Sequence, residues 1–174
     1  MKKITLLMLL IFPFFLVACN EKSTPQKQPA FKGQNLAGEN EVSFLQEMVS
    51  SNPDNINAWI KLGNIFMDTQ RYIEAIDAYQ KALEINPDIT DIRVDLGTCY
   101  RRIGRPDKAI EEYKKALARD PVHPNAHRNM GIVLGFDLGQ KDQAIKELQQ
   151  YLKLLPQAPD RDTIRQAIEK LSAA

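Results

Sequence analysis

The chain has 174 residues, of which 44% are hydrophobic and 26% are charged, a composition that supports a buried core and excludes disorder throughout. Lys2 and Lys3 are the only charged residues before position 19, so the rest of the chain has 23 − 2 = 21 basic residues against 22 acidic ones. This near-neutral balance excludes nucleic acid as the main partner, because phosphate binding needs a clear surplus of positive charge.

The N-terminal residues 1–18 have the pattern of a signal peptide. The two lysines precede an apolar run from Ile4 to Ala18, which only Thr5 and Pro13 interrupt. A membrane-spanning helix needs about 20 apolar residues, so this run is short for one but suits the apolar core of a signal peptide. We therefore exclude residues 1–18 from the fold.

The apolar run ends in Leu16-Val17-Ala18-Cys19, which resembles the lipobox of bacterial lipoproteins. The resemblance implies cleavage before Cys19 and attachment of lipid to its thiol, and hence a membrane anchor in the cell envelope. Asn20, rather than an aspartate, follows the cysteine and favours the outer membrane, facing the periplasm. An ordinary secretory signal with an incidental Cys19 is the alternative.

Residues 19–39 are predicted to form a flexible tether that follows the lipidated cysteine. They are mostly polar, and Phe31 and Leu36 are their only large apolar residues. Such a stretch cannot offset its ordering entropy by burial.

The next segment, residues 40–55, is predicted to be an N-terminal capping helix. Val42, Leu45, Met48 and Val49 fall at helical spacing ahead of Pro53. The segment resembles the second helix of a helix pair whose first helix is missing.

The remaining sequence repeats with a period of about 34 residues. Four prolines are separated by 87 − 53 = 34, 121 − 87 = 34 and 156 − 121 = 35 positions. Small, aromatic and aliphatic residues recur in phase with these prolines, as Trp59, Leu62, Gly63, Phe66, Ala75, Tyr79 and Ala82, then as Arg93, Leu96, Gly97, Tyr100, Ala109, Tyr113 and Ala116, and again as His127, Met130, Gly131, Leu134, Ala144, Leu148 and Tyr151.

These columns resemble the tetratricopeptide repeat (TPR) family across residues 56–158. The resemblance implies an all-α fold, a right-handed superhelical α-solenoid with repeats at residues 56–89, 90–123 and 124–158. The glycine and alanine columns are small where the two helices of a pair cross closely. Residues 159–174 are predicted to form a C-terminal capping helix, with the apolar stripe Ile164, Ala167, Ile168 and Leu171.

The repeats depart from the family pattern at two places. The first column reads Trp59, Arg93 and His127, so we expect packing there to weaken along the chain and His127→Phe to be tolerated. The third repeat has one more residue between Leu134 and Ala144 than the other two have at this point, and we expect it in the turn from residue 135 to 139.

No nucleophile–base pair, phosphate loop or metal-ligand cluster is recognisable, so the sequence predicts no cofactor, no metal and no small-molecule substrate. His123 and His127 are the best metal candidates, but Pro124 suits a first helical turn and leaves His123 outside that helix. We expect Cys99 to be a buried, inert thiol. A metal- or thiol-dependent enzyme that uses these three residues is the alternative function.

The leading hypothesis is a protein-binding module, a lipid-anchored adaptor or assembly factor of the bacterial cell envelope. In TPR proteins the first helices line a concave groove that holds a protein or peptide segment. The resemblance assigns ten polar residues to this groove: Asn57, Lys61, Asn64, Asp91, Asp95, Thr98, Arg102, Asn125, Arg128 and Asn129. A solvated face without a ligand, and a structural spacer in an oligomer, are the other interpretations.

Overall fold

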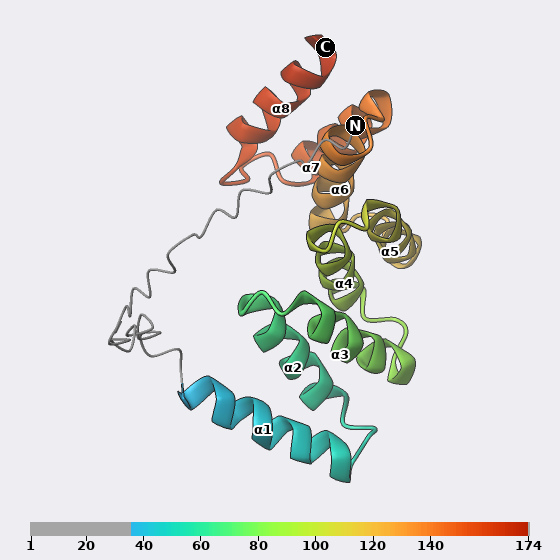
Figure 1. The fold of residues 1–174 in the computed structure, drawn as a ribbon. Helices are drawn as coiled ribbons and strands as arrows, with labels where there is room; N and C mark the ends of the chain where they lie inside the picture. The colour runs from blue at the N-terminus through green and yellow to red at the C-terminus, as the bar shows by residue number, and fades with distance from the viewer. Residues whose placement is uncertain (1–35, 174) are drawn as a thin grey trace, which may run out of the picture. The chain divides into compact units, whose positions relative to one another are not determined.

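The computed structural model describes the backbone of residues 36–173 and the side chains of residues 39–173. This part is all-α, with eight α-helices and one short π-helix along the chain (Figure 1). The predicted signal peptide, Cys19 and the predicted tether as far as residue 35 lie outside it. None of the described helices is both long and apolar enough to cross a membrane.

Three helix pairs form the body of the described part, and their first helices begin at Ile56, Thr90 and Pro124, 34 residues apart. The pairs stack in chain order as a right-handed superhelical α-solenoid, the fold that the sequence predicts. Their bounds are α2 (Ile56–Asp68) with α3 (Tyr72–Ile85), α4 (Thr90–Arg102) with α5 (Pro106–Arg119), and α6 (Pro124–Ile132), continued by the π-helix η1 (Val133–Asp137), with α7 (Lys141–Leu154).

One further helix packs at each end of the stack. α1 (Leu36–Ser51) lies against α2, and α8 (Arg161–Ala173) lies against α7. The α1 helix begins before the predicted position, so residues 36–39 are helical although the sequence assigned them to the tether.

The glycine column gives room for a large side chain of the second helix. A Cβ atom added to Gly97 would lie 2.5 Å from the Tyr113 ring, and one added to Gly131 would lie 2.8 Å from the Leu148 side chain. Both partner side chains are fully buried. The glycines are therefore required by an aromatic or aliphatic side chain that crosses the pair, in addition to the small alanines.

The residue after the glycine in each repeat is polar where the buried side chain of the second helix is a tyrosine, and apolar where it is a leucine. The Tyr79 hydroxyl donates to Asn64 Oδ1 over 2.8 Å, and the Tyr113 hydroxyl lies 3.3 Å from Thr98 Oγ1. The third repeat has Leu148 in this position and apolar Ile132 beside its glycine. Two residues that the sequence assigned to the groove, Asn64 and Thr98, thus also satisfy core hydroxyl groups.

The residue in the first column of each repeat, Trp59, Arg93 or His127, makes a hydrogen bond in addition to its packing contacts. Trp59 Nε1, Arg93 Nη2 and His127 Nε2 each lie within hydrogen-bond distance of the carbonyl oxygen of the preceding inter-repeat proline, at 2.8, 2.9 and 3.0 Å. Each ring or guanidinium N–H group therefore ties the start of its repeat to the turn before it.

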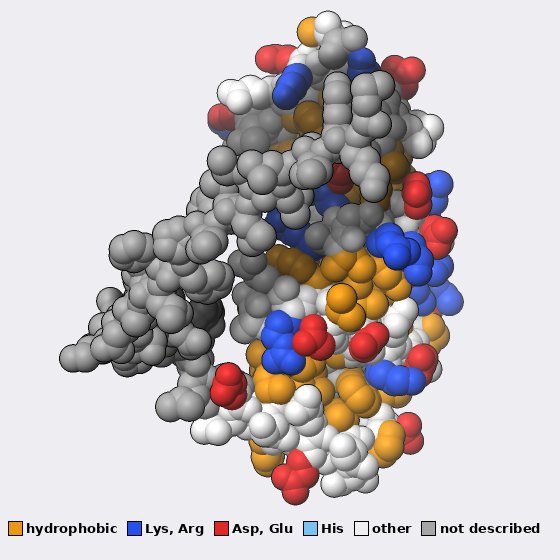
Figure 2. Space-filling view, in the orientation of Figure 1, with side chains coloured by type: hydrophobic (Ala, Val, Ile, Leu, Met, Phe, Trp, Pro, Cys, Tyr) orange, Lys and Arg blue, Asp and Glu red, His pale blue; other side chains and the backbone are white. Residues whose placement is uncertain are grey.

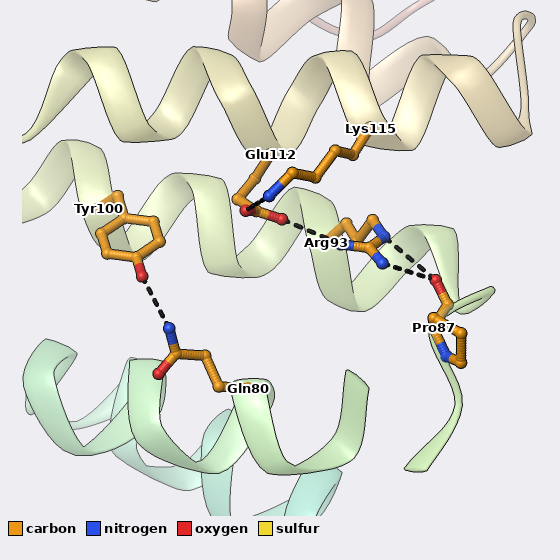
Figure 3. A network of polar contacts seen from close by, with 6 residues as sticks. All are labelled: Gln80, Pro87, Arg93, Tyr100, Glu112 and Lys115. Atoms are coloured by element: carbon orange, nitrogen blue, oxygen red, sulfur yellow. Dashed lines mark hydrogen bonds and ion pairs between the residues drawn. The ribbon is translucent and has the colours of Figure 1, made fainter. Parts of the chain in front are cut away.

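The second and third repeats add an ion pair to this tie. Arg93 Nη1 donates to buried Glu112 over 3.1 Å, and Lys115 reaches the same carboxylate (Figure 3). His127 Nδ1 lies 2.6 Å from Glu147 Oε2 in the third repeat. The structure therefore reverses the expectation for His127→Phe. We expect this variant to be destabilised, because phenylalanine would leave the largely buried Glu147 without its partner.

The extra residue of the third repeat lies in the helix, ahead of the turn. It is absorbed by η1, where the N–H group of Leu138 donates to the carbonyl oxygen of Val133 over 3.1 Å, five residues back. The turn itself keeps its geometry, because Gly139 has a positive φ of 68°, as Gly104 and Gln70 have at 72° and 61° in the other repeats. This corrects the predicted position of the insertion.

The capping helix α8 is fixed by one carboxylate at its start and by apolar packing near its end. Asp160 accepts hydrogen bonds from Arg128 Nε over 2.5 Å and from the Tyr151 hydroxyl over 2.6 Å. Burial favours the neutral acid, but these two hydrogen bonds hold the pKa of Asp160 below its usual value. Further along, Leu171 packs so closely on Gly135 that an added Cβ would lie 2.9 Å from it.

Candidate protein-binding face

The ten residues that the sequence assigned to the groove all lie on the first helices α2, α4 and α6. We call this set of side chains the first-helix face. The hydrogen bond from Asn129 Nδ2 to Thr98 Oγ1, over 3.3 Å, joins α4 to α6 and shows that two of the three helices lie directly side by side. The predicted groove residues of α4 and α6 therefore belong to one continuous surface.

Several members of the first-helix face already have partners within the chain. Lys61 pairs with Glu41 of α1 over 2.7 Å, although both side chains are well exposed. Arg128 pairs with Asp160 and also donates to Asn129 Oδ1 over 3.2 Å. A ligand carboxylate at Arg128 would thus compete with the contact that holds the start of α8.

Three other members are exposed and make no side-chain hydrogen bond or ion pair within residues 39–173: Asn57, Asn125 and Arg102. Asn57 and Asn125 stand in the same column, one in the first turn of α2 and one in the first turn of α6. Each lies directly before an anchor alanine, Ala58 or Ala126, that is almost completely buried. A buried core does not account for these two amides, which can donate to and accept from an extended backbone.

The start of α4 carries the acidic part of the face. Asp91 is exposed and accepts a hydrogen bond of 2.8 Å from His123 Nε2. Asp95 is half-buried, and burial, followed by repulsion from Asp91, raises its pKa to about 6, while the nearby His123 acts in the opposite direction. An anionic ligand group is therefore disfavoured at this end of the face.

The two histidines have both ring nitrogens engaged. His123 Nδ1 accepts from the N–H group of Ala126 over 3.2 Å and so caps α6, while its Nε2 meets Asp91. His127 lies between Glu147 and the carbonyl oxygen of Pro121. These bonds leave neither ring with a free lone pair for a metal, and within residues 39–173 no three His, Cys, Asp or Glu side chains group as metal ligands would.

Cys99 is fully buried in α4. Burial, and then the nearby carboxylate of Asp95, raises the pKa of its thiol to about 12. A thiol with such a pKa is protonated at neutral pH and is a poor nucleophile.

A cluster of basic residues adjoins the first-helix face, which itself includes one of them, Arg102. The end of α4, the turn that follows and the start of α5 have four basic residues within eight positions, Arg101, Arg102, Arg105 and Lys108, with Asp107 as the only acid among them. Arg101, Arg102, Gly104 and Pro106 line a hollow together with Asp137 of η1. Figure 2 shows Lys and Arg side chains gathered over the region of α4 and α5.

Comparison with known families gives one match over most of the chain. Residues 43–162 match the family described as the cytochrome c-type biogenesis protein H TPR domain. The chain belongs to this TPR family. A comparison with the sequences of curated proteins gives no match.

Solved structures of TPR proteins have the same fold. The crystal structure of MamA protein superposes with a TM-score of 0.73 at 20% identity, over 78% of this chain and 72% of that one. The first TPR of Spaghetti (RPAP3), bound to the HSP90 peptide SRMEEVD, gives 0.64 at 22% identity, over 68% and 94%. The Yersinia enterocolitica type III secretion chaperone SycD, in complex with a peptide of the translocator YopD, gives 0.64 at 18% identity, over 69% and 94%.

Proposed function

We propose that this TPR protein is a lipid-anchored adaptor of the bacterial cell envelope whose first-helix face binds an extended segment of another protein. One observation carries the binding part of the proposal. Asn57 and Asn125 are exposed amides without partners in residues 39–173, and they recur in one column directly beside completely packed anchor positions. Each new hydrogen bond to a peptide backbone contributes about 0.5–1.5 kcal/mol net.

The related structures support a peptide as the ligand. The RPAP3 and SycD structures were solved with a peptide of HSP90 and a peptide of YopD, respectively. The name of the family connects its domains with cytochrome c biogenesis, so a polypeptide handled in that process is the first partner to test.

The anchor part of the proposal rests on Leu16-Val17-Ala18-Cys19 at the end of the apolar run. Each buried CH₂ group of an acyl chain contributes about 0.8 kcal/mol, so two or three chains would hold the protein on a membrane. Mass spectrometry of the protein isolated from its native membrane is expected to find an acylated Cys19 as the first residue. A mature protein that begins elsewhere and has a free thiol at Cys19 would contradict the anchor but would leave the binding proposal intact.

Photocrosslinking in the native envelope tests the binding face. A photoreactive amino acid at Asn57 or Asn125 is expected to capture one and the same protein. The matched control carries it at Lys114, which is exposed on the second helix α5. Capture of the same protein from Lys114 with equal yield would place binding elsewhere.

The proposal assigns the chain no catalytic role. The candidates for chemistry in the described part are a buried thiol with a raised pKa and two imidazoles whose ring nitrogens are all bonded. These bonds account for the residues as parts of the fold.

A further inference from the structure

Most arginines of the described part are neutralised by a neighbouring carboxylate. Seven of the nine arginines in residues 39–173 form ion pairs with an aspartate or glutamate: Arg71, Arg93, Arg101, Arg119, Arg128, Arg161 and Arg165. Arg102 and Arg105 form none within this part. Arg102 is the last residue of α4, and Arg105 follows three positions later, directly before α5.

The backbone that carries them is well defined. The N–H groups of Ile103, Gly104 and Arg105 donate to the carbonyl oxygens of Cys99, Arg101 and Tyr100, over 3.1, 3.0 and 2.9 Å. Pro106 then fixes the first position of α5. A turn bonded in this way loses little entropy when its side chains bind a ligand.

The space beside the turn is open, and charged side chains line it. Gly104 has a φ of 72°, and a Cβ added there would meet no atom within 4 Å. Asp137 of η1 forms the opposite wall and receives two hydrogen bonds from Arg101, from Nε over 2.5 Å and from Nη2 over 3.2 Å. Arg101 is thereby neutralised and held, so Arg102 supplies the positive charge left among the residues that line the hollow, and Arg105 lies beside them in the turn.

We propose that this hollow and the adjoining Arg105 bind an acidic segment of the partner protein, with two carboxylate side chains close together that pair with Arg102 in the hollow and with Arg105 beside it. The inference rests on the proposed function, because it names the chemistry of a partner that also contacts the first-helix face. Guanidinium groups present a planar fork of N–H donors that matches a carboxylate. A surplus of two positive charges fits a pair of acidic side chains better than a polyanionic surface, for which clusters of about 4–8 basic residues are typical.

The position of the hollow gives the bound segment a direction. It lies at the last turn of α4, whereas Asp91 lies in the first turn and Asp95 in the second. At a rise of about 1.5 Å per residue, the eleven positions from Asp91 to Arg102 (102 − 91 = 11) span roughly 16 Å along the helix. An extended peptide covers that distance in about five residues. We therefore expect the acidic pair about five residues away from the part of the segment that crosses Asp91.

A defined peptide tests the hollow without knowledge of the natural partner. The probe is acetyl-Gly-Glu-Glu-Gly-amide, added to the full chain at low salt while NMR follows the Gly104 amide and the arginine Nε–H signals. Saturable shifts at Arg102, Arg105 and Gly104 are expected. The affinity should fall at least tenfold for the Gln-Gln peptide and for the Arg102→Gln/Arg105→Gln variant. Arg119→Gln, which removes another exposed arginine, should bind as the unmodified protein does.

Other outcomes overturn the proposal. Equal shifts with the Gln-Gln peptide would show that carboxylates are not recognised. Shifts with inorganic phosphate but none with the Glu-Glu peptide would make the hollow an anion site of another kind. Binding to vesicles that contain anionic lipid, without any response to the peptide, would make the ligand a membrane surface. If the Glu-Glu peptide binds but positions Asn57 and Asn125 capture no protein, the proposal that the first-helix face binds a partner would be refuted. The proposal that the hollow binds carboxylates would stand.

Discussion

His127 and Glu147 form in the third repeat the pair that Arg93 and Glu112 form in the second, with His127 Nδ1 only 2.6 Å from Glu147 Oε2. Both hydrogen-bond partners of the imidazole, the Glu147 carboxylate and the carbonyl oxygen of Pro121, are acceptors. The first repeat has Trp59 with Ala78 in these two columns, a large residue beside a small one. The residues of the two columns thus change together. The contact between the two helices is apolar in the first repeat and an ion pair in the second and third.

Replacement of His127 by phenylalanine is therefore expected to destabilise the protein by about 1–3 kcal/mol, because a largely buried carboxylate loses its partner. His127→Arg, which copies the second repeat, should retain most of the stability. Urea denaturation followed by circular dichroism measures both variants. Equal stability of His127→Phe and the unmodified protein would mean that the pair with Glu147 contributes nothing.

Gly97→Leu is expected to unfold or strongly loosen the array. Even a Cβ atom at this position would lie 2.5 Å from the fully buried Tyr113 ring, so the two helices of the second repeat would have to separate. Overpacking commonly costs about 1–3 kcal/mol, and neighbouring repeats lose their shared interface as well. Gly104→Asn serves as the control, because that glycine has open space around it and asparagine tolerates a positive φ. Thermal melting of both variants gives the comparison, and a Gly97→Leu protein that melts like the control would contradict this packing.

Gln70→Gly is expected to stabilise the first repeat. Gln70 has a φ of 61°, in the left-handed region where the other two repeats have glycine. The left-handed conformation costs a residue with a side chain about 1–2 kcal/mol. Glycine avoids this cost, but its greater freedom in the unfolded chain cancels part of the gain. A net gain of about 0.5–1 kcal/mol in the free energy of unfolding should be measurable by urea denaturation. A loss of stability would show that the Gln70 side chain makes a favourable contact.

Asp95→Asn is expected to stabilise the protein at neutral pH and to flatten its pH dependence. The pKa of Asp95 is about 6 in the folded protein, above the ordinary aspartate value of 3.8, so ionisation opposes folding. The destabilisation is full above pH 6 and is relieved as the pH falls from about 6 to about 4. The shift corresponds to at most about 3 kcal/mol at pH 7.

The measurement is the stability difference between Asp95→Asn and the unmodified protein at pH 7.5 and at pH 4.5. The difference should be positive at the higher pH and small at the lower. Asp77→Asn, which changes an exposed aspartate of α3, should show no such trend. A gain from Asp95→Asn that is the same at both pH values would rule out ionisation as its cause.

The glycine, alanine and aromatic columns were predictable from the sequence, because residues that pack between neighbouring repeats recur with the period of the chain. The tie to the inter-repeat proline was harder to see. Trp59, Arg93 and His127 belong to different residue classes and share only an N–H donor. The change from Ala78 to Glu112 and then to Glu147, 34 and 35 positions further on, is a sequence signal for the ion pairs that accompany this bond in the second and third repeats.

The site was less predictable than the fold. Whether a polar side chain already has a hydrogen-bond or ion-pair partner within the chain depends on contacts between repeats. Arg128 meets Asp160, which is 32 residues away and follows a turn of irregular length. Arg101 meets Asp137, which is 36 residues away and is positioned by the inserted residue of η1. Periodicity placed these arginines on the first helices correctly but could not show that their charges are used within the fold.

The affinity of the crosslinked partner for the variant Asn57→Ala/Asn125→Ala tests the central claim, that the first-helix face binds protein, most directly. The control is Gln143→Ala/Gln149→Ala, which removes two exposed amides from the second helix α7. Loss of at least two backbone hydrogen bonds should weaken binding about tenfold or more in the first variant. The control should bind as tightly as the unmodified protein. An unchanged affinity for the first variant, in a protein that still melts cooperatively, would contradict the account.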